Sequence, residues 1–231
     1  MKNLIIIPAR AGSKRIINKN LVKIRKKPLL YYSLITAKKI KKKFKNTKII
    51  IITDSKKIKD FSLKYVKNEF NYIRPRKLSK DTTTTKDTVK HFLNFLVKKN
   101  KINFDYLILL QPTSPIRNER DIFKALGIIN KSKKIQSIVS TNRTVESLED
   151  VVYKNKNNYD SPSKIIKNFH KKNKNNFFTI NGNFYITRTN FFLRNKNFYN
   201  FKKETVFFEI DKKYFLDVDD KFDLYLAKKL F

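Results

Sequence analysis

A polar loop from Ala9 to Asn20 is the first candidate for phosphate-binding chemistry. It contains a glycine, a serine and several cations, and it follows the apolar run from Asn3 to Ile7, which has the length of a buried strand. In open α/β sheets, ligands bind beyond the carboxyl ends of strands, where backbone N–H groups and cations can meet an anion. The Walker and Rossmann glycine patterns are both absent. A solvated basic loop is the alternative in a chain this rich in lysine.

Two further segments combine turn residues with side chains suited to recognition. Arg74 to Thr85 ends in four consecutive threonines, and a helix cap would explain Asp81 and one threonine, but not all four. Gln111 ends the apolar run from Phe104 to Leu110, so its amide is expected to face a cleft. The alternative is that the prolines after Gln111 only break the strand and that a nearby hydroxyl caps another element.

Two carboxylates near the end of the chain are candidates for a magnesium site. Asp217 and Asp219 are two residues apart, so in an extended chain they face the same side. Carboxylate oxygens are ligands that Mg²⁺ prefers. The alternative is that Asp219 or Asp220 caps the last helix and Asp223 stabilises its first turn. The two interpretations are compatible if they concern different residues.

Alternating apolar segments of strand and helix length predict an α/β fold with a mostly parallel, doubly wound sheet of Rossmann-like type. Asn181-Gly182 is a common turn signal and is expected just before a strand. The expected strands span 3–7, 48–53, 104–110, 135–140, 184–186 and 206–210. The expected helices span 28–42, 55–66, 87–99, 118–130 and 221–230.

Composition limits the class of protein. The chain has 231 residues, 40% of them hydrophobic, and no cysteine, which predicts one folded domain without disulfides or thiolate metal sites. No apolar run is long enough to span a bilayer and no signal peptide is evident, so a cytoplasmic protein is expected. The net charge of +35 suggests a nucleic-acid-binding protein as an alternative. Because the lysines are spread along the whole chain, we favour compositional drift and expect no specific nucleic-acid binding.

Five segments, taken together and in order, resemble the CMP-sialic acid synthetase family. They are Ala-Arg-x-x-Ser-Lys with Lys-Asn, Arg-Pro-x-x-Leu-x-x-Asp-Thr, Leu-Gln-Pro-Thr-Ser-Pro-Ile-Arg, Asn-Gly-x-x-Tyr and Asp-x-Asp. The resemblance implies CMP transfer from CTP to an acidic nine-carbon sugar, with Mg²⁺ as cofactor. It implies nucleotide binding by Arg10, Ala11, Gly12, Ser13, Lys14, Asn20, Arg74, Thr83 and Thr85. It implies sugar binding by Gln111 and Asn181, metal binding by Asp217 and Asp219, and catalytic roles for Lys14, Lys19 and Asp219.

The resemblance weakens between residues 141 and 180, which in the family form an arm exchanged across a homodimer. Lys171-Lys172 stands where the family has Arg-Gln, and Thr179 stands where it has arginine. Ile17 also replaces a proline of the first loop. We therefore expect one nucleotidyltransferase domain over 1–231, with 141–180 as a dimerisation and sugar-site arm. The alternatives are a KDO cytidylyltransferase, a member that has lost activity, and a basic nucleic-acid-binding protein.

Overall fold

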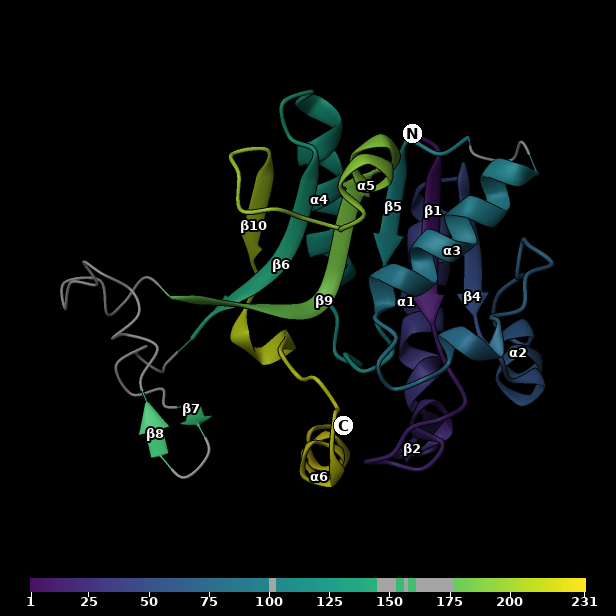
Figure 1. Cartoon of the computed structure of the whole chain (residues 1–231), viewed down its shortest axis with the longest axis vertical. Coiled ribbons are helices and arrows are strands. Elements are labelled where there is room, and N and C mark those ends of the chain that lie inside the picture. Colours follow the sequence, from purple (N-terminus) through teal and green to yellow (C-terminus); the bar gives the residue numbers. More distant parts are fainter. Residues whose placement is uncertain (100–102, 145–152, 156–157, 161–176) are drawn as a thin grey trace.

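The computed structural model shows a six-stranded central sheet with helices on both faces (Figure 1). It describes residues 1–99, 103–144, 153–155, 158–160 and 177–231. The strand order is β10-β6-β9-β5-β1-β4. Three of its ladders are parallel, and β9 alone runs antiparallel to its neighbours β5 and β6. The expected mostly parallel α/β sheet is confirmed. The strands are β1 (Asn3–Pro8), β4 (Thr47–Ile52), β5 (Tyr106–Leu109), β6 (Ser137–Arg143), β9 (Phe178–Arg188) and β10 (Thr205–Glu209).

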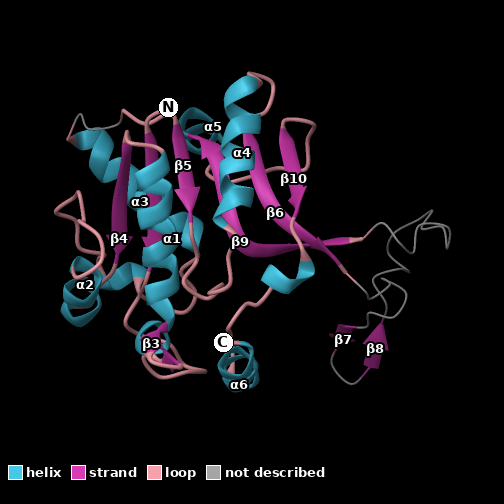
Figure 2. Ribbon diagram, turned by 180° about the vertical axis from the view of Figure 1, so that it is seen from behind, coloured by secondary structure: helices cyan, strands magenta, loops and turns pink. Residues whose placement is uncertain are grey.

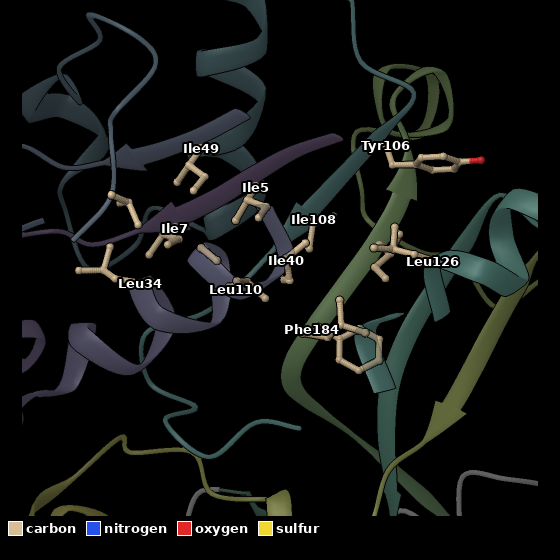
Figure 3. Packing of buried hydrophobic residues seen from close by; sticks show 14 of the residues in the cluster. Ile5, Ile7, Leu34, Ile40, Ile49, Tyr106, Ile108, Leu110, Leu126 and Phe184 are labelled. Carbon is tan, nitrogen blue, oxygen red and sulfur yellow. The ribbon is translucent and has the colours of Figure 1, made fainter. Parts of the chain in front are cut away.

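The central strands are continuous apolar runs because both of their faces are covered. Ile5 and Ile7 of β1 pack into the core on one face, whereas Leu4 and Ile6 pack into the core on the other. All four side chains are inaccessible to solvent. Figure 3 shows the first core, in which aliphatic side chains of β1, β4 and β5 meet those of the covering helices. Burying each such side chain stabilises the fold by about 1.5–3 kcal/mol.

In the described part of the chain, five α-helices cover the two faces of the sheet, and a sixth, α6, is the last element before the C-terminus. Helices α1, α2 and α4 supply apolar residues to one core, and α3 and α5 supply the other. The front and back views show α3 and α5 on one face of the sheet and α1 and α4 on the other (Figures 1 and 2). None of the helices in the described part of the chain is long and apolar enough to cross a membrane. The helices are α1 (Leu29–Lys43), α2 (Lys56–Leu63), α3 (Thr85–Lys98), α4 (Glu119–Lys131), α5 (Thr189–Asn195) and α6 (Lys221–Leu230).

Side-chain caps fix where four helices begin. Ser55 accepts a hydrogen bond from Ile58 N at the start of α2, and Asn118 accepts one from Arg120 N at the start of α4. Asp220 forms a capping box with Asp223, so the structure confirms the helix-cap interpretation for these two residues. Helix α3 begins two residues earlier than expected, because Thr84 forms a capping box with Asp87. These caps satisfy backbone donors that a helix start otherwise leaves free.

The largest difference from expectation is the length of β9. Asn181-Gly182 was expected to form a turn before a strand, but both residues lie inside the eleven-residue strand β9. Gly182 has φ +71°, and the β6–β9 register shifts between Val139 and Thr141. An irregularity of this kind accommodates a left-handed residue without ending the ladder. The short α5 and the two-stranded pairs β2 (Lys23–Ile24)–β3 (Lys27–Pro28) and β7 (Tyr153–Asn155)–β8 (Asn158–Asp160) were also not expected.

Candidate functional site

A cavity of about 430 Å³ lies beyond the carboxyl ends of the central strands. The chain leaves β1 for β4 on one side and returns to β5 on the other, so this edge is a topological switch point. Most of the predicted site residues share the cavity. It is lined by Pro8, Arg10, Gly12, Ser13, Lys14, Arg15, Lys19, Asn20, Arg74, Asp81, Thr83, Thr85, Gln111, Pro112, Thr113 and Asp219.

The loop after β1 is held in place by main-chain and side-chain hydrogen bonds. Ala9 N donates to Ile52 O at 2.9 Å, which extends the β1–β4 pairing by one residue. The buried Asn20 amide donates to Arg10 O at 2.8 Å. Ala11 N donates to the Asp54 carboxylate at 2.8 Å, and Ala11 is not among the cavity-lining residues. The predicted nucleotide contact of Ala11 would therefore require its N–H group to leave Asp54.

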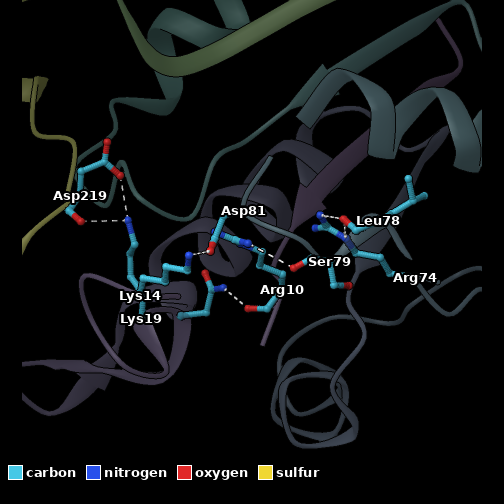
Figure 4. Close-up of polar contacts among 9 residues, drawn as sticks. Arg10, Lys14, Lys19, Arg74, Leu78, Ser79, Asp81 and Asp219 are labelled. Atoms are coloured by element: carbon cyan, nitrogen blue, oxygen red, sulfur yellow. Dashed lines mark hydrogen bonds and ion pairs between the residues drawn. The ribbon is translucent and has the colours of Figure 1, made fainter. Parts of the chain in front are cut away.

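Two predicted phosphate ligands converge on one carboxylate (Figure 4). Arg10 Nη2 lies 2.6 Å and Lys14 Nζ lies 3.1 Å from the two oxygens of Asp81. Hydrogen bonds from Lys14 and Arg10 lower the pKa of Asp81. Because Lys14 is 84% exposed, its side chain can change partners at little cost. The arrangement shows that these two cations can reach a single anionic group in the cavity.

The Arg74 segment forms another wall of the cavity. Arg74 is only 5% exposed, and its guanidinium donates to Leu78 O, with Nε at 3.0 Å (Figure 4). Burial lowers its pKa, and Asp54 opposes that shift. Thr83 and Thr85 line the cavity, whereas Thr84 between them caps α3. The run of threonines therefore serves both a helix start and a cavity wall.

Lys19 and Asp219 meet although they are 200 residues apart in the sequence. Lys19 Nζ lies 2.8 Å from Asp219 Oδ1 and donates to Val218 O at 3.0 Å. A small apolar cluster that includes Ile16 and Val218 packs the first loop against the segment before α6. Val218 N also donates to Thr113 O at 2.7 Å. These contacts place a lysine and a carboxylate side by side at the mouth of the cavity.

Asp217 lies deeper than Asp219 and outside the residues that line the cavity. Its Oδ1 is buried and has no hydrogen-bond partner. Burial raises the pKa of Asp217, a hydrogen bond from Thr113 opposes that shift, and the charge of Asp219 adds to it. A buried carboxylate with an unpaired oxygen beside a second carboxylate is a donor set that suits Mg²⁺. The described residues contain no larger cluster of metal-ligating side chains.

Gln111, just after β5, and Asn181, inside the neighbouring strand β9, face different surroundings. Gln111 lines the cavity, and its Oε1 lies against Gly182, where an added Cβ atom would come within 2.4 Å of it. Asn181 is 4% exposed and does not line the cavity. Its Oδ1 accepts from Ser140 Oγ at 2.7 Å, while its Nδ2 is buried without a partner. The structure thus brings Gln111 next to the segment of Asn181, and sugar binding by either residue stays a prediction.

Two acidic residues of the site were missed by sequence reasoning. A helix cap was the alternative interpretation of Asp81, but Asp81 pairs with Arg10 and Lys14, and Thr84 is the cap of α3. Asp54 was not considered, although it follows a predicted strand and such a position is typical of functional side chains. Its position just after β4 could therefore have identified Asp54 as a candidate site residue. The pairing of Asp81 had no signal in the sequence, because it depends on how two loops meet.

Replacing Asp217 with asparagine is expected to raise the melting temperature at pH 7 by about 2–4 °C. The folded-state pKa of Asp217 is raised above 3.8, so ionisation destabilises the fold at pH values above that pKa. Below pH 3.8 the carboxyl is protonated in both states and this cost is absent. The difference between variant and wild type should therefore shrink as the pH falls towards 4. Calorimetry at several pH values measures this difference in melting temperature, and the exposed Asp219→Asn variant is the control. A melting temperature at pH 7 that is lowered by Asp217→Asn would contradict the raised pKa of Asp217.

Comparison with known proteins agrees with the geometry of this site. An N-acylneuraminate cytidylyltransferase of Escherichia coli is 30% identical over 98% of this chain and 51% of its own length. A CMP-N,N'-diacetyllegionaminic acid synthase of Legionella pneumophila is 36% identical over 61% of this chain and 57% of its own length. These matches thus span about half the length of the two relatives. A post-translational flagellin modification protein B of Campylobacter coli is 31% identical over 98% of this chain and 94% of its length.

The fold is shared with solved nucleotidyltransferase structures. A CMP:2-keto-3-deoxy-manno-octonic acid synthetase complexed with CTP superposes with a TM-score of 0.70 at 18% identity, covering 100% of this chain and 98% of that one. A 4-diphosphocytidyl-2C-methyl-D-erythritol synthase from Anaerococcus prevotii gives 0.67 at 11% identity, covering 98% and 94%. The model of the cytidylyltransferase family matches residues 4–230. The chain therefore belongs to the cytidylyltransferase family.

Proposed function

We propose that this protein transfers CMP from CTP to an acidic nonulosonic sugar and releases pyrophosphate. The observation that carries the proposal is the cavity at the switch point of the sheet, which Arg10, Lys14 and Lys19 line together with Gln111 and Asp219. Cations suited to a triphosphate and an amide suited to sugar hydroxyls thus share one space. The curated relatives named for this chemistry act on acylneuraminic, legionaminic and pseudaminic acids.

The nucleotide would lie along the loop after β1 and the Arg74 segment. Arg10 and Lys14 would exchange Asp81 for phosphate oxygens, a change that costs little because Asp81 and Lys14 are accessible to solvent. Ser13 and Gly12 add a hydroxyl and a backbone N–H group to the same wall. Thr83 and Thr85, together with Arg74, would contact the base. Asn20 would act by holding the Arg10 carbonyl, as it does at 2.8 Å.

Asp217 and Asp219 would hold Mg²⁺, which would supply Lewis-acid charge neutralisation to the phosphates. The unpaired buried oxygen of Asp217 supports this assignment. Asp219 would then release Lys19, whose ammonium lies 2.8 Å from it and would be free to pair with the departing pyrophosphate. In the loaded site the two carboxylates would thus share the metal ion, and Lys19 would pair with phosphate.

The reaction itself needs alignment and charge neutralisation more than covalent help from the protein. The anomeric oxygen of the sugar would attack the α-phosphorus while its hydroxyl proton passes to water. A new P–O bond would form, and the bond between the α-phosphorus and the oxygen it shares with the β-phosphate would break, its electron pair leaving with pyrophosphate. Gln111, at the end of β5, would orient the sugar for this attack from the side opposite the leaving group. Lys14 and Lys19 would stabilise the negative charge that develops on the pyrophosphate.

A homodimer in the cytoplasm is part of the proposal. Residues 145–152, 156–157 and 161–176 of the expected arm lie outside the described part of the chain. An exposed aromatic pair supports an interface elsewhere: Phe201 and Phe207 stack with ring centroids 5.8 Å apart beside the edge strand β10, and Phe201 is 83% exposed. Light scattering of the purified protein would measure the oligomeric state, and a monomer at micromolar concentration would contradict this part.

Two alternatives remain distinguishable by experiment. A cytidylyltransferase for KDO (2-keto-3-deoxy-manno-octonic acid) is the first alternative. The matching synthetase structure for that sugar is only 18% identical, so it supports the fold and not the substrate. A nucleic-acid-binding protein would draw on the net charge of +35. The family match over residues 4–230 and the cavity with Asp219 and Gln111 favour the enzyme.

The test is pyrophosphate release from CTP and Mg²⁺ with N-acetylneuraminic, legionaminic, pseudaminic and KDO sugars in parallel. We expect release with one of the first three and little with KDO. ATP in place of CTP and omission of Mg²⁺ serve as controls and should each abolish release. Release with KDO alone would establish the first alternative. Folded protein that neither binds CTP nor releases pyrophosphate would overturn the enzyme assignment.

A further inference from the structure

We propose that Arg117 is a positioning residue that holds Gln111 and the 181–183 segment of β9 in the geometry that receives the sugar. The inference rests on the proposed function. Arg117 does not line the cavity. It lies behind the cavity, and its three donor nitrogens reach three different elements.

The guanidinium connects the strand ends to the first helix. Nε donates to Asn183 O of β9 at 2.7 Å, Nη1 donates to Ser33 Oγ of α1 at 2.9 Å, and Nη2 donates to Gln111 O. Part of the residue is accessible to solvent, whereas its guanidinium group is surrounded by protein, and burial lowers its pKa to about 9. A buried charge is retained at a cost, which is typical of a group that fixes a specific geometry.

The position of the Gln111 amide depends on this contact. Gln111 O accepts from Arg117 Nη2, from Ser114 N at 3.2 Å and from Ser33 Oγ at 3.4 Å, so the turn that aims the Gln111 side chain is anchored by three donors, and Arg117 also holds Ser33. The side chain then packs against Gly182, the neighbour of Asn183, whose carbonyl accepts from Arg117 Nε. One guanidinium therefore holds both sides of the contact between Gln111 and β9.

The contact to Asn183 extends the network towards Asn181 and the segment before α6. Asn183 N donates to Asn181 Oδ1 at 3.1 Å, and Asn183 Nδ2 donates to Ile116 O at 2.8 Å and Tyr214 O at 3.0 Å. The buried Asn181 Nδ2 has no partner, so the network orients this amide without using its donor. An unpaired buried donor of this kind suits a hydrogen bond to a sugar oxygen in the loaded site.

Lysine could not replace Arg117 here, because an ammonium at the end of a flexible stem is a point donor. The three acceptors lie on different elements, and the planar guanidinium meets them with three fixed donors. Arg117→Lys keeps the charge and loses this fork. The substitution therefore separates the positioning role from the charge of the residue.

The chain offers a matched control on the same strand pairings. Arg188 at the end of β9, like Arg117, donates three hydrogen bonds, in its case to Ile135 O at 3.0 Å, Ile129 O at 2.8 Å and Ser132 O at 3.1 Å. Arg188 is not among the residues that line the cavity. Arg188→Lys therefore reports what the loss of a half-buried guanidinium fork does to the fold alone.

The experiment measures the KM for the sugar, the KM for CTP and kcat in wild type, Arg117→Lys, Arg188→Lys and Ser33→Ala. We expect Arg117→Lys to raise the sugar KM about 10-fold or more, with the KM for CTP within about 2-fold. Arg188→Lys should lower the melting temperature without moving either KM. Ser33→Ala removes the acceptor of Arg117 Nη1 together with the hydrogen bond that Ser33 Oγ donates to Gln111 O, and it should raise the sugar KM by about 2–3-fold, which keeps the test available if Arg117→Lys does not fold.

The outcomes separate this inference from the proposed function. If wild type releases no pyrophosphate with any sugar, the proposed function fails. If wild type is active and the sugar KM is unchanged in Arg117→Lys, or in Ser33→Ala when Arg117→Lys does not fold, the positioning role is refuted. An equal change of the sugar KM in Arg117→Lys and Arg188→Lys would also refute it, because it would reflect general loosening of β9.

Discussion

Replacing Asp219 with alanine is expected to lower kcat by about 1,000-fold or more, because several kcal/mol of charge stabilisation are lost in the transition state. The Asp219 carboxylate is 55% exposed, lines the cavity and is the partner of Lys19 Nζ at 2.8 Å. Its removal takes away a proposed metal ligand and leaves Lys19 without its carboxylate. Initial rates of pyrophosphate release with saturating CTP and sugar measure the effect.

The control for this substitution is Asp60→Ala, which removes an exposed carboxylate on α2 that does not line the cavity. It should leave kcat within about 2-fold of wild type, since isolated surface charges contribute little. Binding of CTP without Mg²⁺ by calorimetry should survive in Asp219→Ala, because Arg10, Lys14 and Arg74 remain. A kcat within about 3-fold of wild type in Asp219→Ala would contradict the metal assignment.

The parts of the site predictable from sequence are those that a single strand and its own loop determine. Asn3 to Ile7 is apolar at every position except the first, which indicates burial on both faces, and the loop that follows must then emerge at one edge of the sheet. Gln111 was placed at the cleft by the same reasoning about β5. Such predictions need no knowledge of how distant segments meet.

Contacts between distant segments were predictable only through family resemblance. The residue types of Lys19 and Asp219 do not predict that the two side chains lie 2.8 Å apart. That contact depends on the small apolar cluster around Val218. The network of Arg117 is a similar case, because Ser33, Gln111 and Asn183 come from three elements. Packing of side chains far apart in sequence decides such geometry, and no local pattern encodes it.

The error at Asn181-Gly182 has a specific physical cause. Asn-Gly favours positive φ, and a turn is the commonest place for such a residue. Here Gly182 has φ +71° inside β9, and the neighbouring register shift between Val139 and Thr141 takes up the irregularity. Gly182 therefore has the positive φ that its sequence predicts, but the hydrogen-bond ladder of β9 continues past it instead of ending in a turn. Because Gly182 has no Cβ atom, the side-chain amide of Gln111 can pack directly against its backbone.

Replacing Gly182 with alanine is accordingly expected to raise the KM for the sugar by about 10–100-fold while leaving the protein folded. The new Cβ would lie 2.4 Å from Gln111 Oε1, so the flexible amide must move away. The positive φ adds a strain of about 1–2 kcal/mol, which is small enough for a stable domain to tolerate. Steady-state kinetics should show the KM for CTP nearly unchanged, because the cations of the first loop are not displaced.

Gly127→Ala is the matched control, since a Cβ atom at Gly127 of α4 would meet nothing within 4 Å. It should stabilise the helix by about 0.5–1 kcal/mol and leave the kinetics unchanged. A double-mutant cycle then decides the mechanism: in a Gln111→Ala background the displaced amide no longer exists, so Gly182→Ala should add little to the sugar KM. If the two substitutions instead multiply their effects, Gly182 acts through the backbone of β9 and the contact with Gln111 carries no sugar recognition.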